Sequence, residues 1–403
     1  MSHLEPSLST PRQRLFSLDV FRGLTIFTMV FVNDVAGVAG IPAWMKHVPA
    51  GVDGMTFVDV VFPAFLFIVG MAIPFAVRNR LRRGDTTWQI CKHVLIRTAG
   101  LLVLGFFMVN AEEMNREAML IPGWLWNVLL YVGAVLLWNR YPKAGSARQQ
   151  SIFRGLRMLG VLVLVALIPL YRKGGAGALM GMTQSWWGIL GLIGWAYLYA
   201  MIPYWLFRRA LYAMTGVLGL FTVLAVGLMS GGIAVPGWLQ FASHAGNLSH
   251  ASLTVAGIVL STMLLRDDVA ATVPKRLTWI LAFGILLAVA ARFLEPLYGI
   301  GKLGATPSWA LYSAAICCGV FALIYWLVDV KGYRSWARFL KPAGENPLLT
   351  YLIPFLLYAL FGYHYLPDPF NEGFLGIFRS VVFSLFVLWL AALLMRANVR
   401  LHL

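Results

Sequence analysis

Long apolar segments follow one another along this 403-residue chain and limit what it can fold into. A helix needs about 20 mainly apolar residues to cross the hydrocarbon core of a bilayer. Segments of that kind lie near residues 18–38, 57–77, 90–110, 121–138, 152–171, 186–206, 211–231, 249–265, 277–298, 308–328, 346–362 and 374–395. The sequence therefore predicts an all-α, polytopic membrane protein of about 12 (11 or 12) transmembrane helices.

The composition excludes a soluble protein of this length. Apolar residues make up 60% of the chain and charged residues only 12%, against roughly 25% charged residues in soluble domains. Membrane lipids must therefore cover most of the surface. The 15 Trp and 15 Tyr residues agree with this environment, because their amphipathic rings favour the headgroup region.

The net charge of +16 raises the question of nucleic-acid binding. The basic residues form small groups between apolar segments rather than one patch, so we expect no nucleic-acid partner. Lys and Arg collect in the cytoplasmic loops of membrane proteins. The same charges can also attract an anionic cytoplasmic cofactor.

The distribution of basic residues predicts the orientation. If residues 1–17 form a cytoplasmic tail and the helices then alternate, 25 of the 32 Lys and Arg residues lie on the cytoplasmic side. Both termini are then cytoplasmic, and residues 18–403 form a single membrane domain. The tail lacks an apolar core with a cleavage site, so we expect no cleaved signal peptide. The seven outer cations are Lys46, Arg116, Arg172, Lys173, Arg292, Lys302 and Arg379.

Polar residues are densest in the first predicted hairpin. Asn33 lies near the outer end of its first helix, His47 in the following loop, and Asp53 and Asp59 come next. A histidine suits acid–base or nucleophilic work at neutral pH, an asparagine can stabilise an oxyanion, and a carboxylate can fix the imidazole tautomer. By spacing alone, a single histidine in a loop is more often simply solvated than catalytic. His244 and His250 are expected to border another outer loop.

Other polar residues are expected at the cytoplasmic ends of helices. Asp19 and Arg22 are three residues apart, so they share a helix face; they form an anchoring ion pair, or Arg22 faces a phosphate. Arg97 belongs to a cytoplasmic basic group. Asn346 can cap a helix or help to hold an anion at its N-terminus. The three cysteines and seven histidines show no metal-ligand spacing, so we expect no metal site.

The first hairpin resembles the transmembrane acyltransferase family of heparan-α-glucosaminide N-acetyltransferase, and the whole chain resembles its bacterial branch, the N-acetylglucosamine-related inner-membrane proteins (domain of unknown function 5009). The hairpin stretches are SLDVFRG (17–23), VN (32–33), KH (46–47), DGMT (53–56) and DVVFP (59–63). Later stretches are WWGILGLIGWAY (186–197), ATPSW (305–309) and PAGENPLLTY (342–351).

This resemblance implies an inner-membrane acetyltransferase that binds acetyl-CoA from the cytoplasm and acetylates an amino sugar or glycan on the opposite side. His47 matches the family's catalytic histidine and Asn33 a nearby catalytic asparagine. We expect Asp59 or Asp53 to orient His47. The nucleotide phosphates would be held at Arg22 and other cytoplasmic groups, for which Asp19, Asn346 and Arg97 are candidates.

The chain departs from the lysosomal enzyme in three ways. The stretch from Asn33 to His47 is longer, GWLWN (123–127) replaces a Gln-Arg pair, and we expect no counterpart of the luminal domain that precedes the membrane part of that enzyme. An alternative function is an inner-membrane transporter of N-acetylglucosamine or a related sugar, since polar groups and Gly/Pro interruptions also serve substrate pathways. A third is a scaffold or lipid-modifying protein with another acyl donor. The oligomeric state stays open, a homodimer included.

Overall fold

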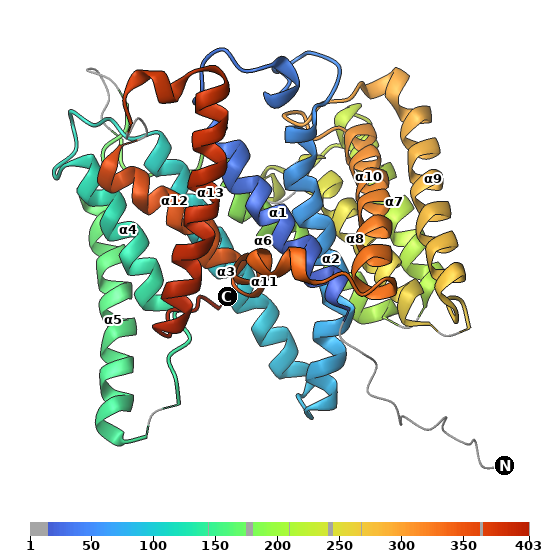
Figure 1. Cartoon of the computed structure of the whole chain (residues 1–403), viewed down its shortest axis with the longest axis horizontal. Coiled ribbons are helices and arrows are strands. Elements are labelled where there is room, and N and C mark those ends of the chain that lie inside the picture. Colours follow the sequence, from blue (N-terminus) through green and yellow to red (C-terminus); the bar gives the residue numbers. More distant parts are fainter. Residues whose placement is uncertain are drawn as a thin grey trace.

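The computed structural model describes residues 15–143, 145–174, 180–208, 210–240, 245–266, 268–362 and 366–402, and each predicted apolar segment is helical in it (Figure 1). The twelve helices are α1 (Phe16–Val35), α2 (Phe57–Arg82), α3 (Thr87–Glu112), α4 (Gly123–Trp138), α5 (Ala147–Leu170), α6 (Gly188–Phe207), α7 (Leu211–Met229), α8 (Ala245–Leu265), α9 (Val273–Tyr298), α10 (Pro307–Tyr325), α12 (Pro347–Phe361) and α13 (Gly373–Arg396). A short helix, α11 (Lys341–Glu345), precedes α12.

The prediction of an all-α polytopic membrane protein is confirmed. Ten of these helices are long and apolar enough to cross a membrane. The two shorter ones, α4 and α12, have 16 and 15 residues and pack against each other. In the described parts of the chain, β structure is limited to isolated bridges.

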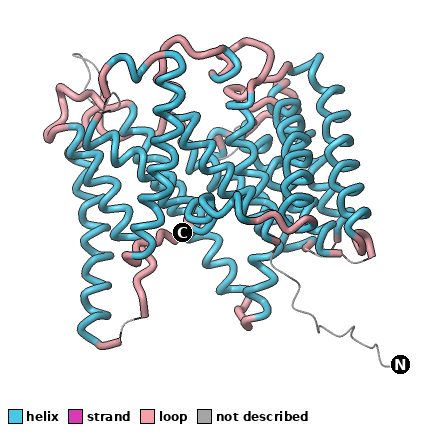
Figure 2. Tube along the Cα trace, in the orientation of Figure 1, coloured by secondary structure: helices cyan, strands magenta, loops and turns pink. Residues whose placement is uncertain are grey.

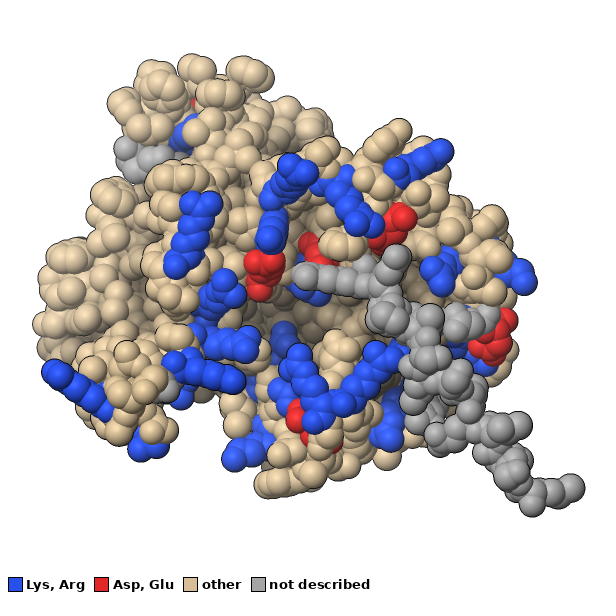
Figure 3. Space-filling model, turned by 60° about the horizontal axis from the view of Figure 1, so that its bottom comes forward, with Lys and Arg blue, Asp and Glu red and all other residues tan. Residues whose placement is uncertain are grey.

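The helix ends gather at two faces of the bundle, and the loops follow them (Figure 2). The start of α1 meets the segment after α10, where the Ser17 amide donates to Asp329 Oδ2 at 3.1 Å. The chain after α13 pairs with the chain after α4, through Leu401 and Asn139. We call this side the basic face, because Lys and Arg side chains surround a hollow there (Figure 3). Helix α1 begins and α13 ends at this face, as alternation requires.

Helices α2 and α8 cross at very close range. A Cβ atom at Gly70 would lie 1.8 Å from the carbonyl oxygen of Thr254, and one at Gly257 would lie 2.0 Å from that of Phe67. Only glycine allows backbones to approach so closely, and small residues commonly provide such contacts between membrane helices. Most of α8 is buried, so this crossing fixes α2 against the centre of the bundle.

Helix α8 starts four residues earlier than the apolar run predicts. Its first turns contain Asn247 and His250, which are buried. The prediction that His250 borders an outer loop is therefore wrong, while His244 lies outside the described residues. Three hydroxyls of this helix donate to its own carbonyls: Ser252 to Ser249 at 2.7 Å, Thr254 to His250 at 3.2 Å and Ser261 to Ile258 at 3.2 Å.

Candidate functional site

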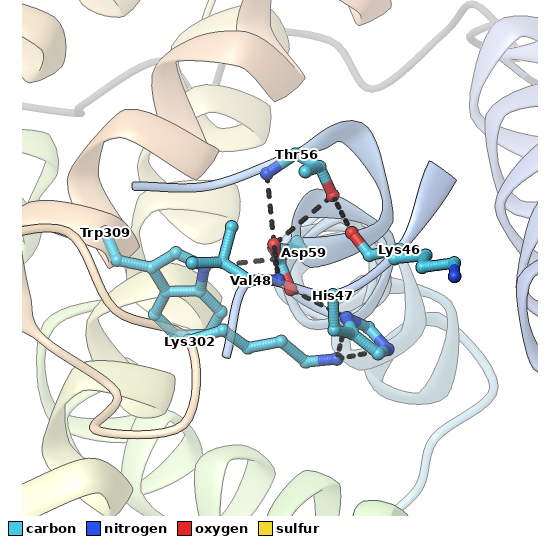
Figure 4. A network of polar contacts seen from close by, with 7 residues as sticks. All are labelled: Lys46, His47, Val48, Thr56, Asp59, Lys302 and Trp309. Atoms are coloured by element: carbon cyan, nitrogen blue, oxygen red, sulfur yellow. Dashed lines mark hydrogen bonds and ion pairs between the residues drawn. The ribbon is translucent and has the colours of Figure 1, made fainter. Parts of the chain in front are cut away.

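His47 lies in the loop between α1 and α2, against the first turn of α2 (Figure 4). Its Nδ1 is 2.7 Å from Asp59 Oδ1. The Asp59 side chain is 1% exposed, whereas that of His47 is 41% exposed. An ionised carboxylate only accepts hydrogen bonds, so we assign the ring proton to Nδ1. The lone pair of the neutral ring is then on Nε2.

The Asp59 carboxylate is fixed by the helix terminus that it caps. Its Oδ2 accepts hydrogen bonds from the amides of Thr56 at 3.0 Å and Val48 at 3.2 Å, and Thr56 and Asp59 form a capping box. The Trp309 indole nitrogen of α10 donates to the Asp59 carbonyl at 3.2 Å. Because Oδ2 is occupied by backbone donors, Oδ1 remains for His47, and the orientation of the ring is set by local helix geometry.

Lys302, in the loop between α9 and α10, completes this group. Its Nζ lies 3.1 Å from both ring nitrogens of His47. Burial lowers the pKa of Lys302 to about 8, although the nearby Asp59 charge raises it. Sequence reasoning missed this role and counted Lys302 only as an outer cation. The available signal was its closeness to ATPSW (305–309), which contains Trp309.

Asp53 contacts the loop after α9, whereas Asp59 contacts His47. Asp53 Oδ1 accepts a hydrogen bond from the Ile300 amide at 2.6 Å, and the Gly54 amide donates to the Ile300 carbonyl at 2.9 Å. Asp53 thus ties the first hairpin to the loop that carries Lys302. Of the two carboxylates predicted to orient His47, the structure brings Asp59 to the ring.

Asn33 lies in the last turn of α1 and is half-buried. Its neighbour Asp34 is fully buried and accepts from Arg379 Nη2 at 3.0 Å and from the Tyr358 hydroxyl at 2.8 Å. These contacts join the outer ends of α1, α12 and α13. Asn33 therefore lies at a helix end that a buried ion pair ties to α13.

The predicted cofactor residues Arg22 and Arg97 line one cavity of about 330 Å³ on the basic face. Arg80, His93 and His402 line it as well, and these three with Arg97 also line an adjoining cavity of about 400 Å³. Burial lowers the pKa of His402, and Arg97, Arg140 and Arg80 lower it further. Such a positive environment favours a bound anion.

The other two predicted cofactor residues lie beside this cavity. Asp19 Oδ1 accepts from Arg22 Nη1 at 3.4 Å, and the same guanidinium nitrogen donates to the Gly344 carbonyl at 3.1 Å. Asn346 is buried and caps α12, accepting from the Leu349 amide at 3.2 Å. Asp19 thus holds Arg22 in place, and Asn346 fixes the start of α12 at the cavity wall.

The cavity follows α2 toward the histidine site. Its lining on this helix runs from Arg80 to Phe65, a length of about 22 Å at the helical rise. Asp59 lies six residues beyond Phe65, about 9 Å farther along the axis. Phe62 fills this interval and packs against His250, with 5.2 Å between ring centroids. One helix therefore connects a cationic cavity at one face with a histidine–carboxylate pair at the other.

Comparison with known proteins gives two findings. The family described as "Domain of unknown function (DUF5009)" matches residues 14–235. The human heparan-alpha-glucosaminide N-acetyltransferase is 35% identical over 136 residues, which is 32% of this chain and 20% of that protein. The mouse protein of the same name is 33% identical over 139 residues, with the same coverage. The chain thus spans about a fifth of the length of these relatives, and the resemblance inferred from the hairpin is confirmed.

Proposed function

We propose that this chain, which belongs to the DUF5009 family, is a transmembrane acetyltransferase that moves an acetyl group from cytoplasmic acetyl-CoA to an amino sugar or related glycan on the periplasmic side of a bacterial inner membrane. The observation that carries the proposal is the alignment along α2 of a cationic cavity and the His47–Asp59 pair. The relatives, named as N-acetyltransferases of a glucosaminide, support this reaction class.

The donor side follows from the charges. An excess of Lys and Arg makes the basic face cytoplasmic. Coenzyme A has an anionic nucleotide head and a long uncharged arm, and the cavity has matching halves. Its polar end carries Arg22, Arg80 and Arg97. Each guanidinium group can bind two oxygens of a phosphate at once. Phe65 and Ile68 line its apolar end, which faces the histidine site.

The acceptor side uses Nε2 of His47. As the acceptor amine or hydroxyl attacks the thioester carbonyl, Nε2 takes its proton and the new bond to the acetyl carbon forms. Asp59 stabilises the resulting imidazolium. The carbon–sulfur bond then breaks, and the leaving coenzyme A thiolate takes the proton back from the imidazolium. The Lys302 ammonium and the Asn33 amide stabilise the oxyanion. A route in which Nε2 first carries the acetyl group uses the same residues and would leave labelled acetyl on the protein.

The test is an assay of the purified, lipid-reconstituted protein with labelled acetyl-CoA and glucosamine. We expect the parent to form N-acetylglucosamine and His47→Ala to lose activity by about 10²–10⁴-fold, with unchanged thermal unfolding. A parent rate in His47→Ala would contradict the proposal. Movement of labelled sugar into proteoliposomes without acetyl-CoA would show a transporter instead.

A further inference from the structure

Another cavity on the basic face lies between α13 and the segment that leads into α12. Its volume is about 500 Å³. The wall combines two kinds of side chain, basic and apolar. The basic ones are Arg338, Lys341, Arg396 and Arg400, and the apolar ones include Phe339, Leu385, Leu388 and Trp389. We call this cavity the basic groove.

The charges of the basic groove are unbalanced. One acid, Glu345, lines it, and that carboxylate is 3.7 Å from Lys341 Nζ. Within the described ranges, no ion pair joins the guanidinium of Arg338, Arg396 or Arg400 to a carboxylate. The groove therefore presents a local surplus of positive charge.

The backbone holds one of these cations in place. The Arg400 amide donates to Asn139 Oδ1 at 2.9 Å, and the Arg140 amide donates to the Arg400 carbonyl at 2.7 Å. These bonds fix the chain after α13 against the end of α4. Arg400 is thus directed to the groove by a defined structure.

The apolar wall continues toward the membrane interior. Trp389 lies seven residues before Arg396 on α13, about 10 Å deeper along the axis. Its side chain is 57% exposed, and it stacks on Phe386 with 5.6 Å between ring centroids. Phe339 and Leu385 are also exposed. A ligand that satisfies the whole groove needs an anionic head at the cytoplasmic interface and an apolar tail beside α13.

We propose that the basic groove binds an anionic phospholipid of the cytoplasmic leaflet, with its phosphate among Arg338, Arg396 and Arg400 and an acyl chain along Trp389. Basic pockets between membrane helices at the cytoplasmic side recognise such headgroups. A soluble phosphate would use the cations but leave the apolar wall uncovered. Because Glu345 also lines the cavity assigned to acetyl-CoA, a bound lipid would support the wall between the two sites.

The test measures binding of phosphatidylglycerol and phosphatidylcholine to the purified protein by native mass spectrometry. Each cation near the surface contributes about 1 kcal/mol, or about fivefold in affinity. We therefore expect Arg338→Gln/Arg396→Gln/Arg400→Gln to weaken phosphatidylglycerol binding on the order of a hundredfold. The matched control changes three exposed cations elsewhere, Lys143, Arg148 and Arg154, to Gln and should keep parent affinity.

Two further measurements separate a lipid from a soluble phosphate. Glycerol 3-phosphate should compete poorly with phosphatidylglycerol for binding. Trp389→Ala should weaken the binding of phosphatidylglycerol but leave the binding of glycerol 3-phosphate unchanged. Equal binding of the two lipids, equal loss in the control variant, or full competition by glycerol 3-phosphate would overturn the proposal. These readouts do not depend on acetyl transfer, so they stand apart from the test of the proposed function.

Discussion

Charges are arranged differently at the two ends of α2. At the histidine end, cations have specific partners: Lys302 contacts the ring of His47, and Arg379 pairs with the buried Asp34. At the basic-face end, cations outnumber acids: Arg22, Arg80 and Arg97 line one cavity with a single acid, Glu345, although Arg80 also pairs with Asp85 at 3.0 Å. Paired charges fix the geometry of a small site, whereas unbalanced charges create a potential that attracts an anion. The first arrangement suits a catalytic site in which covalent bonds form and break, and the second suits the binding of a charged substrate.

The strongest test of the paired end is Asp59→Asn. The amide keeps the shape of the side chain but favours the wrong imidazole tautomer, so we expect acetyl transfer to fall about 10⁴-fold, as in other histidine–aspartate pairs. The matched control is Asp53→Asn, which changes a carboxylate that contacts Ile300 rather than His47. An equal loss in both variants would show that the pairing with His47 is not what matters.

The buried ion pair gives the next largest effect. Arg379→Leu leaves Asp34 buried without its cation, which typically costs 3–5 kcal/mol of unfolding free energy. We expect a marked fall in the unfolding temperature of the detergent-solubilised protein. The double variant Asp34→Leu/Arg379→Leu removes both charges and should recover much of the loss. A single variant as stable as the parent would mean that this pair does not hold the outer ends of α1 and α13.

At the unbalanced end, Arg97→Gln should act on donor binding. A hydrogen bond to a charged group contributes about 1.5–3 kcal/mol, so we expect KM for acetyl-CoA to rise roughly 10–150-fold with a small change in kcat. Arg154→Gln, an exposed cation outside the cavity, should leave KM unchanged. If kcat fell and KM stayed constant, Arg97 would not be a donor-binding residue.

The lowered pKa of Lys302 predicts that the rate of acetyl transfer depends on pH. Its pKa is lowered to about 8, so the ammonium is present below that pH and is lost above it. We expect the parent rate to fall as the pH rises through about 8, because oxyanion stabilisation is lost. Lys302→Met should be slower at neutral pH and lack this decline, whereas Lys302→Arg should move it upward. An unchanged inflection in Lys302→Met would rule out Lys302 as its origin.

Much of the fold could be predicted from sequence because lipid imposes a simple rule on length and polarity. Each apolar run became a helix, but the start of α8 was misplaced because Asn247 and His250 are polar yet buried. For the site, the hairpin identified His47 and its carboxylates. The choice between Asp53 and Asp59 depended on a helix cap, which spacing does not resolve.

The role of Lys302 was missed for another reason, although its closeness to ATPSW (305–309) was a signal. It lies 255 residues from His47 in the chain, and the contact arises only when the loop between α9 and α10 folds over the hairpin. The hydrogen bond from Ile300 to Asp53 fixes that loop. Contacts of this range depend on packing, which a single sequence does not encode in a local pattern.

The most direct measurement of the central claim is sided acetyl transfer in proteoliposomes of uniform orientation. Labelled acetyl-CoA is supplied only at the basic face, and an impermeant amino-sugar acceptor only at the opposite face. The account predicts labelled N-acetyl product at the acceptor side with the parent and none with His47→Ala. Product that forms only when donor and acceptor share one side would contradict transfer across the membrane.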